Sequence, residues 1–145
     1  NKKVNILIGL LLTVVLLGAC AGQPEEAAVV SEPVLTMSGA ATASWTKEDL
    51  QGMIQTSSEY TDKEGNVTVY EGVAINDLLS AAGVSDYATV TLVASDGYSA
   101  DVTMEELSAC AACIVAFDED GTLRSVMPDF SGKQQVKDLV ELSVQ

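Results

Sequence analysis

The sequence has 145 residues, of which 21 are acidic, 7 are basic and none is histidine, so its formal net charge is −14. This balance excludes nucleic acid as a natural partner, because phosphate backbones are bound by clusters of lysine and arginine. The absence of histidine likewise excludes Ser/His/Asp and Cys/His catalysis.

The N-terminal segment has the pattern of an export signal. Two lysines precede an uncharged apolar run from Val4 to Leu17. The run is shorter than the about 20 apolar residues that a transmembrane helix needs. It ends in LGAC, which resembles the lipobox of bacterial lipoproteins. We therefore expect residues 1–19 to be a signal peptide and Cys20 to be the lipidated residue of a protein in the bacterial cell envelope.

The composition changes after the expected signal. Residues 20–33 are small, acidic and bounded by proline, which predicts a flexible tether. Residues 34–145 are of single-domain size. The chain from Cys20 onward has five basic against 21 acidic residues, a net charge of −16. An anionic membrane surface repels such a chain, so we expect attachment to rest on the lipid, since two acyl chains anchor a protein stably.

The first half of the domain predicts strands and one helix. Val34–Ser38 is a strand candidate, and GAATAS after it is a turn of small residues. Thr46 is suited to cap a helix that runs through Leu50. The runs Met53–Tyr60 and Val67–Tyr70 flank the polar turn TDKEGN, which predicts a hairpin.

The second half continues this mixture of short helices and strands. EGVAINDLLSAAGV has apolar residues at helical spacing and predicts a helix of about two turns with Gly83 at its C-cap. Ala88–Ala94 is predicted to be a central strand and Tyr98–Val102 its return, followed by a capping box of Thr103 and Glu106. A last hairpin and strand are predicted for Cys113–Phe117, Thr122–Met127 and the tail from Leu139. The pattern indicates an α+β fold with a mixed β-sheet and short helices.

Four blocks of sequence, taken in order, resemble a known family. They are YEGVAINDLLSAAGV, VTLVASDGYSADVTMEEL, CIVAFDEDGTL and SGKQQVKDLVELSV. They resemble the oxidoreductase molybdopterin-binding domain of the sulfite oxidase type, and the resemblance covers about 110 residues. It implies that family's fold and, for its enzymes, a molybdenum ion held partly by a cysteine thiolate.

The residues that this chemistry needs are missing from the matching positions. Thr56, Ser57 and Ser58 stand where the resemblance implies the thiolate, and a hydroxyl is a poor soft ligand. Arg124 is the single arginine, whereas the family's enzymes use basic residues to hold the pterin phosphate and an oxyanion substrate. We therefore expect a lipid-anchored, non-catalytic binding or accessory module without a cofactor. The alternative is an authentic molybdopterin-dependent oxidoreductase component.

Two candidate sites stand out. Ser95, Asp96, Gly97 and Tyr98 lie in the block that the resemblance places on the cofactor side, so they are candidates for lining a pocket; the alternative is a plain hairpin turn.

Cys110 and Cys113 form a CAAC element, for which three interpretations remain open: reduced core residues, a structural disulfide, or a catalytic thiol pair. Two thiols without histidine make a poor metal site, and the acidic run Asp118–Asp120 is expected to be a solvated hairpin tip. No catalytic residue and no metal site is assigned, and a small ligand or a partner protein remains the expected binding partner.

Overall fold

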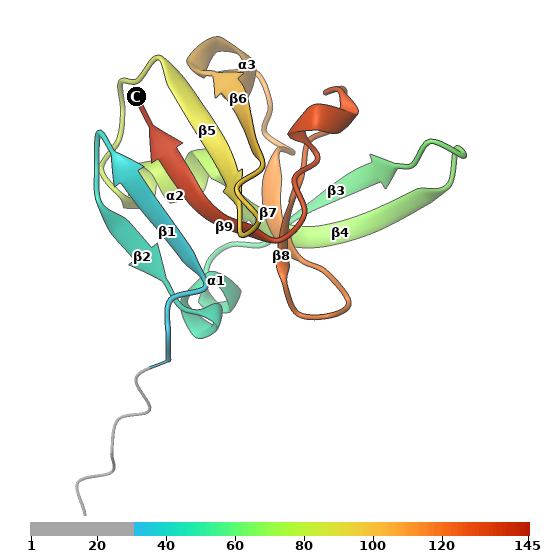
Figure 1. The fold of residues 1–145 in the computed structure, drawn as a ribbon, viewed down its shortest axis with the longest axis horizontal. Helices are drawn as coiled ribbons and strands as arrows, with labels where there is room; N and C mark the ends of the chain where they lie inside the picture. Colours follow the sequence, from blue (N-terminus) through green and yellow to red (C-terminus); the bar gives the residue numbers. More distant parts are fainter. Residues whose placement is uncertain (1–30) are drawn as a thin grey trace, which may run out of the picture. The chain divides into compact units, whose positions relative to one another are not determined.

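The computed structural model describes residues 31–145, which form an α+β fold with two β-sheets and short helices (Figure 1). Sheet A has the strand order β2-β1-β9-β5-β6, and sheet B has the order β3-β4-β7-β8. The strands are β1 (Leu35–Gly39), β2 (Ala43–Trp45), β3 (Thr56–Thr61), β4 (Val67–Ala74), β5 (Thr89–Ala94), β6 (Ser99–Thr103), β7 (Ile114–Phe117), β8 (Leu123–Val126) and β9 (Leu139–Val144). The helices are α1 (Lys47–Gly52), α2 (Ile75–Ala81), α3 (Met104–Ser108) and the 3₁₀ turn η1 (Gly132–Gln134).

Sheet A is mixed because β9 pairs in parallel with β1 and antiparallel with β5. Its strands alternate between buried and less buried side chains, as in β5, where Val90, Leu92 and Ala94 are buried. This period of two directs one face of the sheet into the core. The core continues through Leu78 and Leu79 of α2 and through the inner residues of sheet B.

Sheet B is antiparallel, and its first two strands form a hairpin that extends away from the rest of the domain (Figure 1). β4 changes its surroundings along its length. Val73 near its end is 1 % exposed and belongs to the core, whereas Val67 and Val69, on the same face, are 57 % and 61 % exposed. The outer half of this hairpin therefore presents apolar side chains to solvent.

The helix ends follow the local sequence signals. Thr46 and Asp49 form a capping box at α1, and Thr103 and Glu106 form one at α3. Gly83 has a φ of +77°, and the Val84 N–H donates to the Leu79 carbonyl, as expected for a glycine that ends a helix. The predicted capping box of α3 and the predicted glycine C-cap of α2 are both confirmed.

Some predictions about the strands were wrong. The segment predicted as a turn of small residues contains β2, which pairs with β1. β4 continues to Ala74, four residues beyond the predicted end at Tyr70. The strands divide into two sheets, so the predicted mixed sheet corresponds to sheet A alone. The predicted central strand is confirmed, because β5 lies inside sheet A between β9 and β6.

Three expectations about the N-terminus concern residues outside the described range. The signal peptide, the lipidated Cys20 and most of the tether fall within residues 1–30, and only residues 31–33 of the tether are described. Within residues 31–145, no helix is long and apolar enough to cross a membrane.

Candidate functional site

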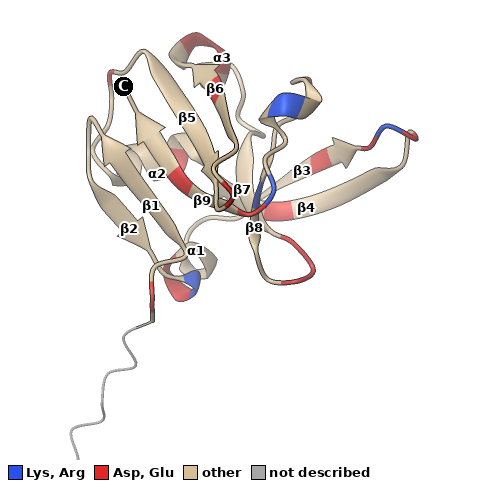
Figure 2. Ribbon diagram, viewed as in Figure 1, with Lys and Arg blue, Asp and Glu red and all other residues tan. Residues whose placement is uncertain are grey.

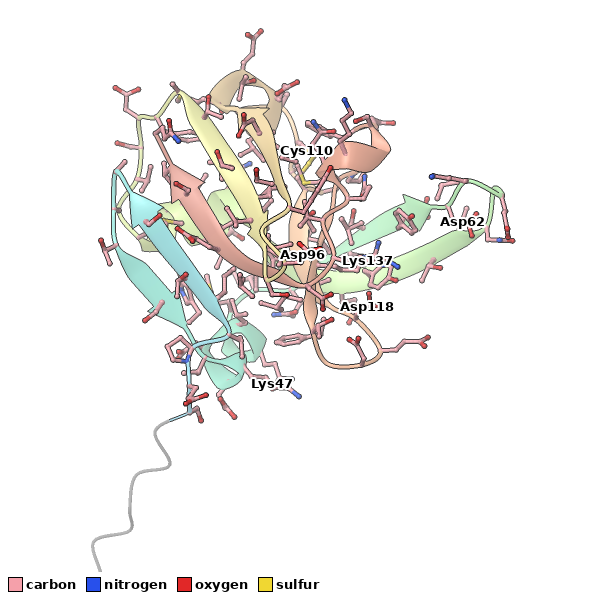
Figure 3. The ribbon with its side chains drawn as sticks, viewed as in Figure 1. Lys47, Asp62, Asp96, Cys110, Asp118 and Lys137 are labelled. Carbon is pink, nitrogen blue, oxygen red and sulfur yellow. A yellow bond between two sulfur atoms is a disulfide. The ribbon has the colours of Figure 1, made fainter. Side chains whose placement is uncertain are left out.

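The predicted pocket residues Ser95–Tyr98 form the turn between β5 and β6. The Gly97 N–H donates to the Ala94 carbonyl at 3.0 Å, and Gly97 has a φ of +88°, a conformation that favours glycine. The Tyr98 N–H donates to Asp96 Oδ1 at 2.9 Å. Asp96 and Gly97 thus supply the backbone of the turn, and Figure 3 shows Asp96 at this corner.

The other two residues of this turn lie in different surroundings. Tyr98 is 45 % exposed, and its hydroxyl donates to the Lys133 carbonyl at 3.0 Å, which links the turn to η1. Ser95 lines an open hollow of about 340 Å³. The other residues of this hollow are Pro33, Val34, Gly121, Thr122, Leu123, Asp138, Leu139 and Val140. A ligand at this turn stays a prediction.

Cys110 and Cys113 are joined in a disulfide (Figure 3). The bridge follows the C-terminus of α3, and Cys113 is 1 % exposed. The loop is also fixed to α2, because the Asn76 side-chain amide donates to the Leu107 carbonyl at 2.8 Å and the Ile75 N–H donates to the Cys113 carbonyl at 2.9 Å. Of the three interpretations of the CAAC element, the structure contains the disulfide, and the cysteines are not reduced core residues.

Several open hollows lie around Pro128. Three hollows of about 320, 390 and 410 Å³ share this residue, and we call them together the Pro128 cleft. Their walls come from β3, from the loop that carries the disulfide and from the segment after β8. The lining residues are Ser57, Ser58, Glu59, Tyr60, Thr61, Val69, Glu106, Ala109, Cys110, Ala111, Ala112, Met127, Pro128, Asp129, Phe130 and Gln135.

The wall formed by residues 127–130 is held in place by Gln135. The side-chain carbonyl of Gln135 accepts from the Met127 N–H at 3.0 Å, and its amide donates to the Met127 carbonyl. Both backbone polar groups of Met127 are therefore satisfied by one side chain. Residues 127–130 form no backbone hydrogen bond with β3 in the described fold.

The serines that stand in place of the expected thiolate lie on β3 at this cleft. Ser57 is exposed, whereas Ser58 is 4 % exposed and its hydroxyl has no hydrogen-bond partner within residues 31–145. A buried hydroxyl without a partner carries a cost of about 1–3 kcal/mol. The family resemblance drew attention to these positions because the expected thiolate is missing. It did not indicate that Ser58 is buried beside a cleft.

Arg124 is buried in sheet B, and its Nε and Nη2 have no hydrogen-bond partner within residues 31–145. Its guanidinium carbon lies 4.5 Å from the ring centroid of Tyr60 and 4.7 Å from that of Tyr70. Its Nη1 donates to the Tyr70 hydroxyl at 2.8 Å and forms an ion pair with Asp118 at 3.3 Å. Arg124 is absent from the walls of the three hollows, so it does not serve the Pro128 cleft.

The charges around the cleft are negative. Glu59, Glu106 and Asp129 line it, and the lining residues include no lysine or arginine. The backbone N–H and hydroxyl of Thr103 bond to Glu106 and hold the pKa of its carboxyl below the ordinary value, so this group is ionised at neutral pH. Figure 2 shows how few basic segments the described fold contains.

These residues do not fit a molybdenum–pterin group. Both cysteines of residues 31–145 are in the disulfide, so no thiolate is present there to bind the metal. The described residues also contain no cluster of three or more metal-ligating His, Cys, Asp or Glu side chains. Within the Pro128 cleft a pterin phosphate would have no basic partner, because the lining residues include no lysine or arginine and Arg124 is stacked on two tyrosines.

Comparison with known proteins agrees with this fold. No family model matches the sequence, and no curated protein matches it. Among solved structures, the chain is similar to the sulfane dehydrogenase SoxCD from Paracoccus pantotrophus, with a TM-score of 0.63 and 18 % sequence identity. The match covers 79 % of this chain and 38 % of that chain. At this identity the likeness confirms the expected fold, a sulfite oxidase-like α+β domain, and nothing further.

Proposed function

We propose that this chain is a non-catalytic binding or accessory module that uses a sulfite oxidase-like domain without molybdenum. The observation that carries the proposal is the chemistry of the Pro128 cleft. Ser57 and Ser58 line it where the family's enzymes would have a thiolate, and its charged residues are all acidic. An acidic cleft repels a pterin phosphate and an oxyanion substrate alike.

The hollows of the cleft are nevertheless large enough to hold a ligand. Its three hollows of about 320, 390 and 410 Å³ lie in the size range of about 300–1,000 Å³ that is usual for ligand sites. Apolar groups from Val69, Met127 and Phe130 line it together with the carboxylates. This combination suits a ligand or partner segment that is both apolar and cationic.

The proposal places the module outside the cytoplasm, attached to a membrane through a lipid on Cys20. The sequence LGAC and the preceding apolar run support this part. The matched test is Cys20→Ser in the full chain, followed by separation of membrane and soluble fractions. We expect the parent chain to be lipid-labelled and to lie in the membrane fraction, and the variant to lose both properties. Equal lipid labelling of both chains would contradict the anchor.

Acid release of pterin tests whether the purified chain carries the cofactor. The full chain is produced in a host that makes the molybdenum cofactor, purified, and treated with acid so that any bound pterin becomes fluorescent. We expect no stoichiometric pterin from a folded sample. One pterin per chain would favour the alternative function, a molybdopterin-dependent oxidoreductase component, and would contradict the proposal.

A further inference from the structure

Strand β3 is an open edge of sheet B. It pairs along all six residues with β4, and its other side has no strand partner within the described fold. The remaining sheet edges are short or covered. β2 has only three residues. In β8, the Ser125 N–H donates to the Val136 carbonyl, and Arg124 forms a β-bridge with Lys137. In β6, the Asp101 carbonyl accepts from the Gln134 side chain. β3 also contains neither lysine nor proline, the residues that commonly block such edges.

The register shows which backbone groups face the open side. The Asp62 N–H donates to the Asn66 carbonyl at 3.0 Å, which makes these two residues a hydrogen-bonded pair next to Thr61 and Val67. Bonded and non-bonded pairs alternate along an antiparallel ladder. The backbone N–H and C=O of Ser57, Glu59 and Thr61 therefore point away from β4, and all three residues are exposed.

These three residues also line the Pro128 cleft, so the open edge is one wall of a groove. The opposite wall is the 127–130 segment, whose own backbone is satisfied in part by Gln135. Sheet strands lie about 4.8 Å apart, so a segment added to β3 would run along the side of the strand that lines the cleft.

The charge of the groove decides what kind of segment fits. Glu59 stands at the middle of the open edge, with Asp129 across the groove. Residues 31–145 contain five basic and 19 acidic residues. A second copy of this chain is opposed by charge, because pairing two β3 edges brings like carboxylates together. A partner segment with basic side chains is favoured instead.

We propose that β3 and the Pro128 cleft bind an extended segment of a partner protein in which basic and apolar residues alternate. The segment adds as a further strand and bonds to the backbone of Ser57, Glu59 and Thr61. A basic residue opposite Glu59 lies on the same face as the Glu59 side chain and next to its carboxylate. This inference deepens the proposed binding role and rests on it.

The test uses a defined probe, a blocked seven-residue peptide of alternating lysine and valine, with glutamate in place of lysine as the control peptide. Amide hydrogen exchange of the full chain is followed residue by residue. We expect the lysine peptide to slow exchange at Ser57, Glu59 and Thr61. The amides of Ser58 and Tyr60 already face β4, so their exchange is expected to stay unchanged.

Matched variants separate the contribution of backbone hydrogen bonds to peptide binding from the contribution of charge. Thr61→Pro removes one outward N–H and keeps every charge, and we expect the peptide to bind at least about threefold more weakly. Glu59→Gln is expected to weaken binding about two- to fivefold, whereas Glu71→Gln, the same charge change on β4, is expected to leave it within about twofold. Protection at Ser58 and Tyr60 reports whether each variant keeps the hairpin.

Several results would overturn the docking surface. Equal binding of the glutamate peptide, equal effects of Glu59→Gln and Glu71→Gln, or protection that misses the three outward amides would each do so. Concentration-dependent protection without peptide would assign the edge to a second copy. Pterin release is a separate measurement, so a chain without pterin that ignores the peptide overturns this inference and leaves the proposed absence of the cofactor standing.

Discussion

The guanidinium carbon of Arg124 lies 4.5 Å from the ring centroid of Tyr60, on the first strand of sheet B, although 64 residues separate the two in sequence. Tyr70 covers the guanidinium group as well, at 4.7 Å. Arginine stacks well on aromatic rings. The single arginine of this chain therefore stabilises the β3–β4 hairpin against β8.

Replacing Arg124 is expected to destabilise the fold. Arg124→Ala removes both stacking contacts, the bond to the Tyr70 hydroxyl and the ion pair with Asp118. We expect the free energy of unfolding to fall by about 3 kcal/mol, at the lower end for a broken buried pair because Asp118 is partly exposed. Urea denaturation measures the change. Lys63→Ala at the hairpin tip is the control and is expected to stay within about 0.5 kcal/mol; an equally small effect at Arg124 would contradict the structural role.

Gly72 is expected to tolerate no side chain. A Cβ at this position would lie 2.2 Å from the Val115 carbonyl oxygen of the neighbouring strand β7, which is backbone and has little freedom to move. We expect Gly72→Ala to lower the free energy of unfolding by about 3 kcal/mol or to shift the β4–β7 register. Gly52→Ala, where nothing lies within 4 Å, is expected to be neutral or stabilising. Similar effects of the two variants on the thermal midpoint would count against this pairing.

Reduction of the disulfide is expected to weaken the domain moderately. Cys110 and Cys113 are three residues apart, so the closed loop is small and its loss lowers the free energy of unfolding by about 2 kcal/mol. Urea denaturation with and without reductant measures the difference. The double variant Cys110→Ala, Cys113→Ala is the control, because reductant then has nothing to cleave. A parent chain that is insensitive to reductant would show that the bridge does not stabilise the native state.

The capping carboxylates give the stability a definite dependence on pH. Bonds from the backbone N–H and hydroxyl of Thr103 hold the pKa of Glu106 below its ordinary value, and Thr46 does the same for Asp49. Such groups stabilise the fold at pH values above their unfolded pKa. That stabilisation is lost as the pH falls through the lower folded pKa.

Glu106→Gln checks this dependence. The glutamine keeps a capping side chain but does not titrate, so the thermal midpoints of parent and variant are expected to differ most at neutral pH and to converge in acid. Glu105→Gln, which changes the same charge one residue earlier in α3 without a capping bond, is the matched control. A constant difference between the parent and the Glu106 variant across the pH range would contradict the capping role.

The parts of the fold that were predicted correctly depend on neighbouring residues. The capping box of Thr103 and Glu106, the C-cap at Gly83 and the hairpin around TDKEGN are each specified within a few positions. β2 was missed because ASW is too short to show a period. The division into two sheets was missed because adjacent residues such as Ile114 and Val115 are both buried, so the local pattern does not show which face meets which partner.

The candidate site was harder to predict from the sequence than the local elements of the fold. The Ser95–Tyr98 turn was selected through the family resemblance, and its local sequence equally fits the hairpin turn that the structure contains. The Pro128 cleft instead joins Glu59, Ala112 and Pro128, which lie far apart in the chain. Only the tertiary fold brings them together, and only the register of β3 identifies the outward amides.

The measurement that tests the central claim most directly is the molybdenum content of the full chain, determined by elemental analysis after production in a host that makes the cofactor. Folding of the same sample is established by the protection of the Ser58 and Tyr60 amides in β3. We expect a folded chain without stoichiometric molybdenum, because the described residues offer no thiolate and the Pro128 cleft has no basic residue in its lining. One molybdenum per folded chain would contradict the account.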